Sequence, residues 1–203
     1  MAGAAVFLGD SITDCDRLWD VRPDGLGFGY VRKIKEGLPA GEALRLYNRG
    51  HNGFTAFQVR ERLAEDLSGI APHTATLQVG INDLAGHLYG GGYGAEGFGK
   101  ELCRILGALK DRGIPHLILL EPFVFPVPAM YRTWEEPLSL FAKEARAAAR
   151  QCGAAFVPLW ELFKKAMEDC PPEALTTDGI HLTERGHELA AKAWLEEYGR
   201  MAK

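Results

Sequence analysis

Two short segments of this 203-residue chain carry residue types whose spacing suits nucleophilic attack on a carbonyl group. GDSIT (9–13) presents Ser11 directly after an apolar run, and DGIH (178–181) places Asp178 three residues before His181. A serine hydroxyl becomes a nucleophile when a neighbouring base takes its proton. At a spacing of three, the aspartate and the histidine can share one face of a turn, so that the carboxylate fixes the ring tautomer and supports the imidazolium. We therefore interpret Ser11, Asp178 and His181 as a catalytic triad.

Two further segments, NRGHNG (48–53) and GIND (80–83), offer hydrogen-bond donors for the oxyanion that such an attack creates. Gly50 has no side chain to keep a substrate away from its backbone N–H. Asn82 carries a side-chain amide that can donate to the same oxygen, and the loss of one such donor typically lowers turnover by roughly 10²- to 10³-fold. We therefore predict that Gly50 and Asn82 stabilise the oxyanion.

The same residues could also have purely structural roles. Ser11 could cap a helix after the first strand, and Asn82 could cap a helix that begins at Asp83. Gly50 and Gly53 could serve only to allow left-handed turns. Because the four segments occur together, we favour catalysis for Ser11, Gly50 and Asn82, and a structural role for Gly53 and Asp83.

The neighbours of these residues are assigned simpler roles. Asp10 is expected to order the turn after the first strand through backbone hydrogen bonds. Cys15 lies between Asp14 and Asp16, whose charges disfavour a thiolate, so we do not expect a cysteine nucleophile. His51 lies in a site loop, where it could contact a substrate.

Short apolar segments that alternate with helical patterns predict the elements that position these groups. The predicted strands are 5–9, 44–48, 75–80, 116–121 and 154–159. The predicted helices are 29–38, 56–67, 98–113 and 136–153, with two more around 160–168 and 184–198. This alternation indicates one domain, residues 1–203, with an α/β fold: a three-layer α/β/α sandwich around a five-stranded parallel sheet.

The site loops are expected at the carboxyl ends of the first three strands, because open parallel sheets bind their ligands there. The glycine-rich segment 86–99 is predicted to be a flexible loop at the rim of this site. Its sequence GYGAEG (92–97) formally matches a dinucleotide fingerprint, but it does not directly follow a strand, so a nucleotide site is disfavoured. Tyr89 and Tyr93 of this loop could stack on a sugar.

Composition excludes several other classes of protein. The chain is 47% hydrophobic and 25% charged, with a formal net charge of −4, which gives no basic surface for a nucleic acid. No apolar run approaches the roughly 18 residues of a membrane span, and we see no signal peptide, so we expect a cytoplasmic protein without a membrane partner. The four cysteines form no C-x-x-C pair, and we therefore predict neither a metal site nor disulfide bonds.

Taken in order, GDSIT, NRGHNG, GIND and DGIH resemble the four signature blocks of the SGNH hydrolases, also called GDSL esterases. The resemblance spans nearly the whole domain. It implies a flavodoxin-like SGNH hydrolase fold, a triad of Ser11, Asp178 and His181, and no cofactor or metal. It also implies an oxyanion hole in which the N–H of Ser11 joins Gly50 and Asn82.

Within that superfamily, the chain looks most like the small intracellular carbohydrate esterases of the acetyl-xylan esterase type. It departs from them at Thr177, where some carry tryptophan before the triad aspartate, and at His51 and Asn52, which replace a commoner Ile-Ser pair. We expect a serine esterase that hydrolyses short-chain acyl esters, acetyl esters above all, of small molecules or oligosaccharides through an acyl-enzyme. Similar relatives are often oligomeric, so a homo-oligomer stays open.

Two alternatives stay open as well. The first is a thioesterase or lysophospholipase of the same superfamily, with the same triad and a longer acyl pocket. The second, from a different class, is a flavodoxin-like binding module whose first loop holds a phosphate. The D-x-x-H segment near the end of the chain disfavours the binding module, because a flavin binder has no use for it.

Overall fold

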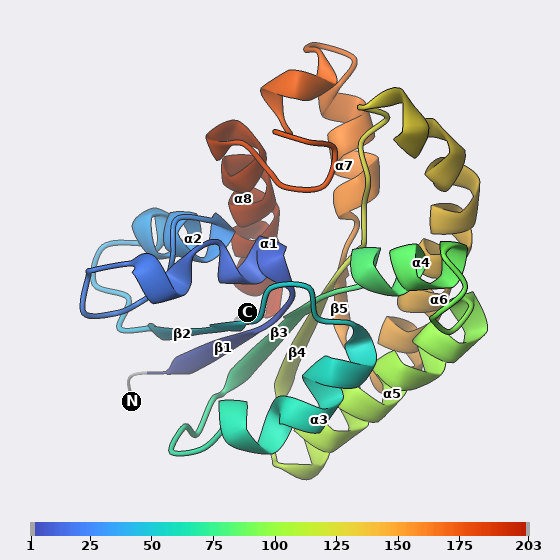
Figure 1. Cartoon of the computed structure of the whole chain (residues 1–203). Helices are drawn as coiled ribbons and strands as arrows, with labels where there is room; N and C mark the ends of the chain where they lie inside the picture. The colour runs from blue at the N-terminus through green and yellow to red at the C-terminus, as the bar shows by residue number, and fades with distance from the viewer. Residues whose placement is uncertain (1–2, 202–203) are drawn as a thin grey trace.

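Parallel strands form a five-stranded sheet at the centre of the computed structural model, which describes residues 3–201 (Figure 1). The strand order is β2-β1-β3-β4-β5, the order of flavodoxin-like proteins. The strands are β1 (Ala4–Gly9), β2 (Arg45–Gly50), β3 (Thr74–Gln78), β4 (His116–Leu120) and β5 (Ala155–Val157). All five predicted strands are confirmed, with ends that differ from the predicted ones by at most two residues.

Helices cover both faces of this sheet, as Figure 1 shows. On one face α2 (Tyr30–Gly37) packs against α8 (Glu184–Met201), and on the other lie α3 (Ala56–Asp66), α5 (Ala95–Asp111) and α6 (Glu135–Cys152). The shorter elements are α1 (Ser11–Asp14), α4 (Ile81–Leu88), α7 (Leu159–Ala166), η1 (Arg17–Trp19), η2 (Ala129–Trp134) and η3 (Pro172–Ala174). The three-layer α/β/α prediction is confirmed. No helix within residues 3–201 combines the length and the apolar character needed to cross a membrane.

The core holds the sheet rigid beneath the site, because the strands are buried on both faces. Phe7 of β1 is fully buried and packs against the ring of Trp194 from α8, with centroids 5.3 Å apart. The indole N–H of Trp194 donates to the hydroxyl of Thr76 in β3 at 2.8 Å, so this buried polar group is satisfied. The middle of the sheet and α8 are thus joined as one packed unit.

The predicted flexible loop over 86–99 is wrong at both of its ends. The helix α4 continues to Leu88 and α5 begins at Ala95, which leaves only residues 89–94 as a loop. Glycine usually weakens a helix, yet Gly99 lies inside α5 because a side chain there would press on Glu144 of α6, with its Cβ 2.9 Å from a carboxylate oxygen. This glycine serves the close packing of two helices rather than flexibility.

Candidate active site

The carboxyl ends of β1, β2 and β3 lie side by side. Gly9 at the end of β1 pairs with Gly50 on one side and with Gln78 on the other. Because β1 lies between the second and third strands, the chain reverses its direction of travel across the sheet here, and such a switch point is where open α/β sheets bind ligands. A fourth segment from the end of the chain, around 176–182, reaches the same place.

Ser11 is the first residue of α1, and Asp10 rather than Ser11 caps that helix. The Asp10 carboxylate accepts the backbone N–H of Ile12 at 3.0 Å, so the Ser11 hydroxyl is not used in capping. The Ser11 Oγ instead lies 3.0 Å from Nε2 of His181, and Nδ1 of His181 lies 2.6 Å from Oδ2 of Asp178. The structure therefore brings the three predicted triad residues together in one hydrogen-bond chain.

The carboxylate of Asp178 is held by the turn on which it lies. Its Oδ1 accepts the backbone N–H groups of Ile180 and His181, at 2.9 and 2.8 Å. Partial burial alone would raise the pKa of the Asp178 carboxyl, but hydrogen bonds from the His181 ring and these two N–H groups outweigh it and lower that pKa. An ionised carboxylate that accepts the Nδ1 proton leaves Nε2 of His181 free to accept the Ser11 hydroxyl.

One open cavity of about 520 Å³ lies over this chain of hydrogen bonds. Ser11, Gly53, Asn82 and His181 all line it. About half of the side-chain surface of Asp178 and of His181 is exposed, so solvent reaches the acid–base pair.

Asn82 lies near the start of α4, with its amide at the cavity. Its Nδ2 donates to the backbone carbonyl of Phe54 at 3.0 Å. A carboxamide nitrogen carries two hydrogens, so the second is available to an oxygen placed in the cavity. The position of Asn82 agrees with the role that the sequence predicts for it.

Gly50 does not line the cavity, and its predicted role as an oxyanion donor is not supported. Its N–H donates to the side-chain oxygen of Asn48 at 2.9 Å, and its backbone is buried against α1, where a Cβ would overlap the backbone nitrogen of Asp14. The glycine is needed here for close packing. The strand β2 continues two residues further than predicted, to Gly50. The N–H of Gly50 is therefore bonded within the fold and does not face the cavity.

Gly53, which the sequence analysis treats as structural, is the glycine of that segment at the cavity wall. It has a φ of +76°, so it does serve a left-handed turn, and it also lines the same cavity as Ser11 and Asn82. No hydrogen bond from its N–H to another group within residues 3–201 is present. The position of Gly53 in NRGHNG could have indicated this, because Gly53 lies further beyond the end of the strand than Gly50 does.

Cys15 contacts a histidine other than that of the triad. Its Sγ lies 3.5 Å from Nε2 of His187, whose Nδ1 accepts the backbone N–H of Tyr30 at 3.1 Å. With Nδ1 used as an acceptor, neutral His187 carries its proton on Nε2 and cannot take one from the thiol. Burial, the largest cause, raises the pKa of Cys15 to about 11 and lowers the pKa of His187 to about 4. These contacts agree with the expectation that Cys15 is not a nucleophile.

The two structural assignments for aspartates near the site are confirmed. Asp10 caps α1, as described above, and both carboxylate oxygens of Asp83 accept the N–H of Ala56 at the start of α3, at 3.1 and 3.0 Å. Burial raises the pKa of Asp10 and of Asp83 to about 7.

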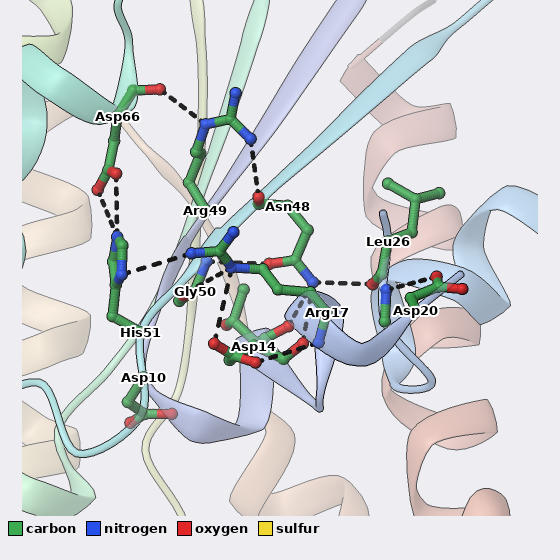
Figure 2. Close-up of polar contacts among 12 residues, drawn as sticks. Asp10, Asp14, Arg17, Asp20, Leu26, Asn48, Arg49, Gly50, His51 and Asp66 are labelled. Carbon is green, nitrogen blue, oxygen red and sulfur yellow. Dashed lines mark hydrogen bonds and ion pairs between the residues drawn. The ribbon is translucent and has the colours of Figure 1, made fainter. Parts of the chain in front are cut away.

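His51 is turned away from the cavity. Figure 2 shows its ring between Asp66 and Arg17, with Nε2 at 2.9 and 3.0 Å from the two carboxylate oxygens of Asp66. The interpretation of His51 as a residue that contacts substrate is therefore not supported, because both ring nitrogens face protein groups.

Comparison with known proteins places this arrangement in a family. The model of the GDSL-like lipase/acylhydrolase family matches residues 7–189. An acetylxylan esterase from Geobacillus stearothermophilus is 28% identical over 216 residues, which cover 96% of this chain and 93% of that protein.

Solved structures give the same result. A protein from Parabacteroides merdae described as a GDSL-like lipase is 30% identical and superimposes with a TM-score of 0.89, covering 98% of this chain and 96% of the other. Another solved structure is that of a catalytic mutant of an acetylxylan esterase from Geobacillus stearothermophilus, which is 25% identical. It superimposes with a TM-score of 0.82, and the match covers 97% of this chain and 94% of the esterase chain. With this fold and these four sequence blocks, the chain belongs to the GDSL-like lipase/acylhydrolase family and is a carboxylic ester hydrolase.

Proposed function

We propose that this protein is a serine esterase that removes short acyl groups, acetyl above all, from carbohydrates through a covalent acyl-enzyme. The observation that carries the proposal is the hydrogen-bond chain from Asp178 through His181 to Ser11, which ends at an open cavity beside Asn82.

In the first half of the reaction, Oγ of Ser11 attacks the ester carbonyl carbon while its proton passes to Nε2 of His181. The carbonyl oxygen becomes an oxyanion, which the N–H groups of Ser11 and Gly53 and the amide of Asn82 stabilise. The tetrahedral intermediate then collapses. The bond to the alcohol oxygen breaks, and the proton on His181 passes to the departing alcohol, which leaves the acyl group on Ser11.

In the second half, water takes the place of the alcohol. It loses a proton to Nε2 of His181 as its oxygen attacks the acyl carbonyl, and the same donors hold the second oxyanion. The bond to Oγ of Ser11 breaks and the proton returns to Ser11, which releases the carboxylic acid. The exposed flank of His181 gives this water direct access to the base.

Solved mutants of a relative support the assignment of the triad. Catalytic mutants of the Geobacillus acetylxylan esterase replace a serine, an aspartate and a histidine by alanine, and that aspartate and histidine lie three positions apart. Asp178 and His181 have the same spacing in this chain.

A second open cavity, also of about 520 Å³, supports a carbohydrate as the alcohol side of the ester. It shares Asn82 with the first cavity, and its walls include Phe57, Tyr93 and the backbone of glycines 90–92. The residues Phe57 and Tyr93 are 40% and 55% exposed. Exposed aromatic faces beside a polar groove suit the apolar face and the hydroxyl edge of a sugar.

The side chains that line the catalytic cavity support a short acyl group over a long one, because polar residues interrupt its apolar members. Most side chains around it are polar, and its apolar members are Ile12, Ile180 and Leu182. A lysophospholipase or long-chain thioesterase buries its acyl chain against a continuous apolar wall, because each methylene taken from water contributes about 0.8 kcal/mol.

The test compares native protein with Ser11→Ala on p-nitrophenyl esters from acetyl to long-chain acyl, and then on acetylated xylooligosaccharides. We expect activity on the short esters only, and its loss in Ser11→Ala. Preference for long chains would favour the lipid or thioester alternative, and activity that survives Ser11→Ala would contradict the mechanism.

The carbohydrate half of the proposal is tested separately with Tyr93→Ala. We expect a higher KM for acetylated xylooligosaccharides and an unchanged KM for p-nitrophenyl acetate, which carries no sugar. Equal effects on both substrates would show that the second cavity does not hold the sugar.

A further inference from the structure

We propose that His51 is a positioning residue that holds two of the oxyanion donors, the N–H of Gly53 and the amide of Asn82, in place. The proposal rests on the function proposed above. Its basis is a continuous set of contacts from the buried carboxylate of Asp66 through the His51 ring to the loop at the cavity wall.

Residues 51–54 form a tight turn that begins at His51. The N–H of Phe54 donates to the His51 carbonyl at 3.2 Å, and the N–H of His51 donates to the carbonyl of Gly9 at 3.0 Å. Gly53, the third residue of this turn, has the positive φ that such a turn demands there. The direction of the Gly53 N–H is therefore set by how firmly the turn is held at His51.

The side chain of His51 supplies that hold, as Figure 2 shows. The Arg17 guanidinium lies 3.5 Å from Nδ1 and also donates to the carbonyl of Gly50 at 2.8 Å. Since a guanidinium only donates, Nδ1 is the acceptor, and Nε2–H donates to Asp66. Asp66 is 4% exposed and is the last residue of α3. Its backbone carbonyl accepts a hydrogen bond from Nε of Arg49 at 3.1 Å. The ring is thus held from two sides by groups that are themselves fixed.

The ring of His51 also reaches Asn82, by way of Phe54. The two rings stack with centroids 4.6 Å apart and an angle of 23° between their planes. The carbonyl of Phe54 is the acceptor for Nδ2 of Asn82 at 3.0 Å. A shift of Phe54 would therefore rotate the amide that faces the cavity, and a misplaced oxyanion donor lowers the rate of the chemical step.

Three substitutions at position 51 separate these contacts. His51→Phe keeps a ring to stack on Phe54 but cannot bond to Asp66. His51→Gln can donate to Asp66 through its amide nitrogen and accept from Arg17 through its oxygen. His51→Asn is polar but too short to reach Asp66. His73→Phe is the matched control, because His73 is exposed, directly precedes β3 at the amino end of that strand, and does not line the cavity.

Steady-state kinetics on p-nitrophenyl acetate, with thermal unfolding as a check of the fold, test the proposal. In His51→Phe and His51→Asn we expect kcat and kcat/KM to fall together, by roughly 10- to 100-fold, because the donors act in the transition state. We expect His51→Gln to recover most of this loss, and His73→Phe to behave as native protein. If His51→Phe does not fold, the comparison of His51→Asn with His51→Gln decides the matter.

Several outcomes would overturn the proposal. One is a folded His51→Phe or His51→Asn with native kcat. Another is a higher KM at unchanged kcat, which would make His51 a residue that binds substrate. A third is a folded His51→Gln as impaired as His51→Asn. Ser11→Ala is measured alongside: if it keeps its activity, the proposed function fails, whereas its inactivity together with any of these results defeats the positioning role alone.

Discussion

Ser11 and His181 are 170 positions apart in the chain, yet the serine Oγ and the histidine Nε2 are 3.0 Å apart in the structure. The serine is fixed at the end of β1, and the histidine lies in the loop before α8. The packing of α8 against α2 and the sheet brings these distant segments together. The distance between the two atoms is therefore a property of the whole fold.

Replacement of the triad carboxylate tests the role of Asp178. In Asp178→Asn the side-chain oxygen can still accept the N–H groups of Ile180 and His181, so the turn should persist, but a neutral amide cannot support an imidazolium. We expect kcat for p-nitrophenyl acetate to fall by roughly 10³- to 10⁴-fold. A variant with native thermal stability and native kcat would remove Asp178 from the mechanism.

Removal of the Asn82 amide tests the oxyanion hole. We expect Asn82→Ala to lower kcat by roughly 10²- to 10³-fold with little change in KM, because the amide serves the oxyanion and not the ground-state ester. Asn82→Asp, which replaces the free N–H donor by a charged oxygen, is expected to be at least as impaired. Native kcat in a folded Asn82→Ala would show that the cavity uses other donors.

The two glycines of the second loop are expected to respond differently to alanine. A methyl group at Gly50 would overlap Asp14, so Gly50→Ala is expected to reduce thermal stability strongly or to prevent folding. Gly53 has no atom within 4 Å of a Cβ, but its φ of +76° costs an alanine roughly 1–2 kcal/mol. Thermal unfolding of both variants compares them, and a Gly50→Ala protein as stable as Gly53→Ala would contradict this difference.

The buried His187 makes stability depend on pH. Burial, and to a lesser degree Lys33 and His181, lowers its pKa from 6.5 to about 4. Between these values the unfolded chain takes up a proton at His187 that the folded protein refuses, so the contribution of His187 to the free energy of unfolding falls as the pH falls. Asp10 and Asp83 act in the opposite direction, because their raised pKa values make the folded protein bind protons more readily than the unfolded chain. The His187 contribution is fully present above pH 6.5, and we expect this contribution alone to lose about 2 kcal/mol between pH 7.5 and pH 5.

His187→Asn isolates this contribution, because its side-chain oxygen can still accept the Tyr30 N–H but does not titrate. Urea unfolding of both proteins at the two pH values measures the difference. The free energy of unfolding is expected to fall by about 2 kcal/mol more in native protein than in the variant on going from pH 7.5 to pH 5, and an equal change in both proteins would contradict the prediction.

The meeting of Ser11, Asp178 and His181 could be predicted from the sequence because its signals are local. The segment DGIH carries both Asp178 and His181 on one turn, and Ser11 directly follows an apolar strand. Parallel strands end at one edge, so the meeting of these segments follows from the fold class alone.

The local sequence does not decide which of Gly50 and Gly53 lies at the cavity. That depends on where β2 ends, and the apolar pattern stops at Asn48 although the strand continues to Gly50. Pairing with Gly9 of β1 extends it, and a single sequence does not reveal that pairing. The contact of His51 with Asp66 could not be predicted for a similar reason, because it depends on how α3 packs against the loop that carries His51.

The two parts of the site, Ser11 on one side and Asp178 with His181 on the other, are attached to the fold in different ways. Ser11 begins a turn of helix that follows a buried strand, whereas the half-exposed side chains of Asp178 and His181 lie on a loop outside the sheet, which hydrogen bonds such as those from Thr176 and Thr177 to the His181 carbonyl hold in place. Local opening of that loop separates the base from the nucleophile without disturbing the sheet. Mild heat or denaturant is therefore expected to inactivate the enzyme reversibly while its circular dichroism is still that of the native protein, so loss of turnover would report on the loop rather than on global unfolding.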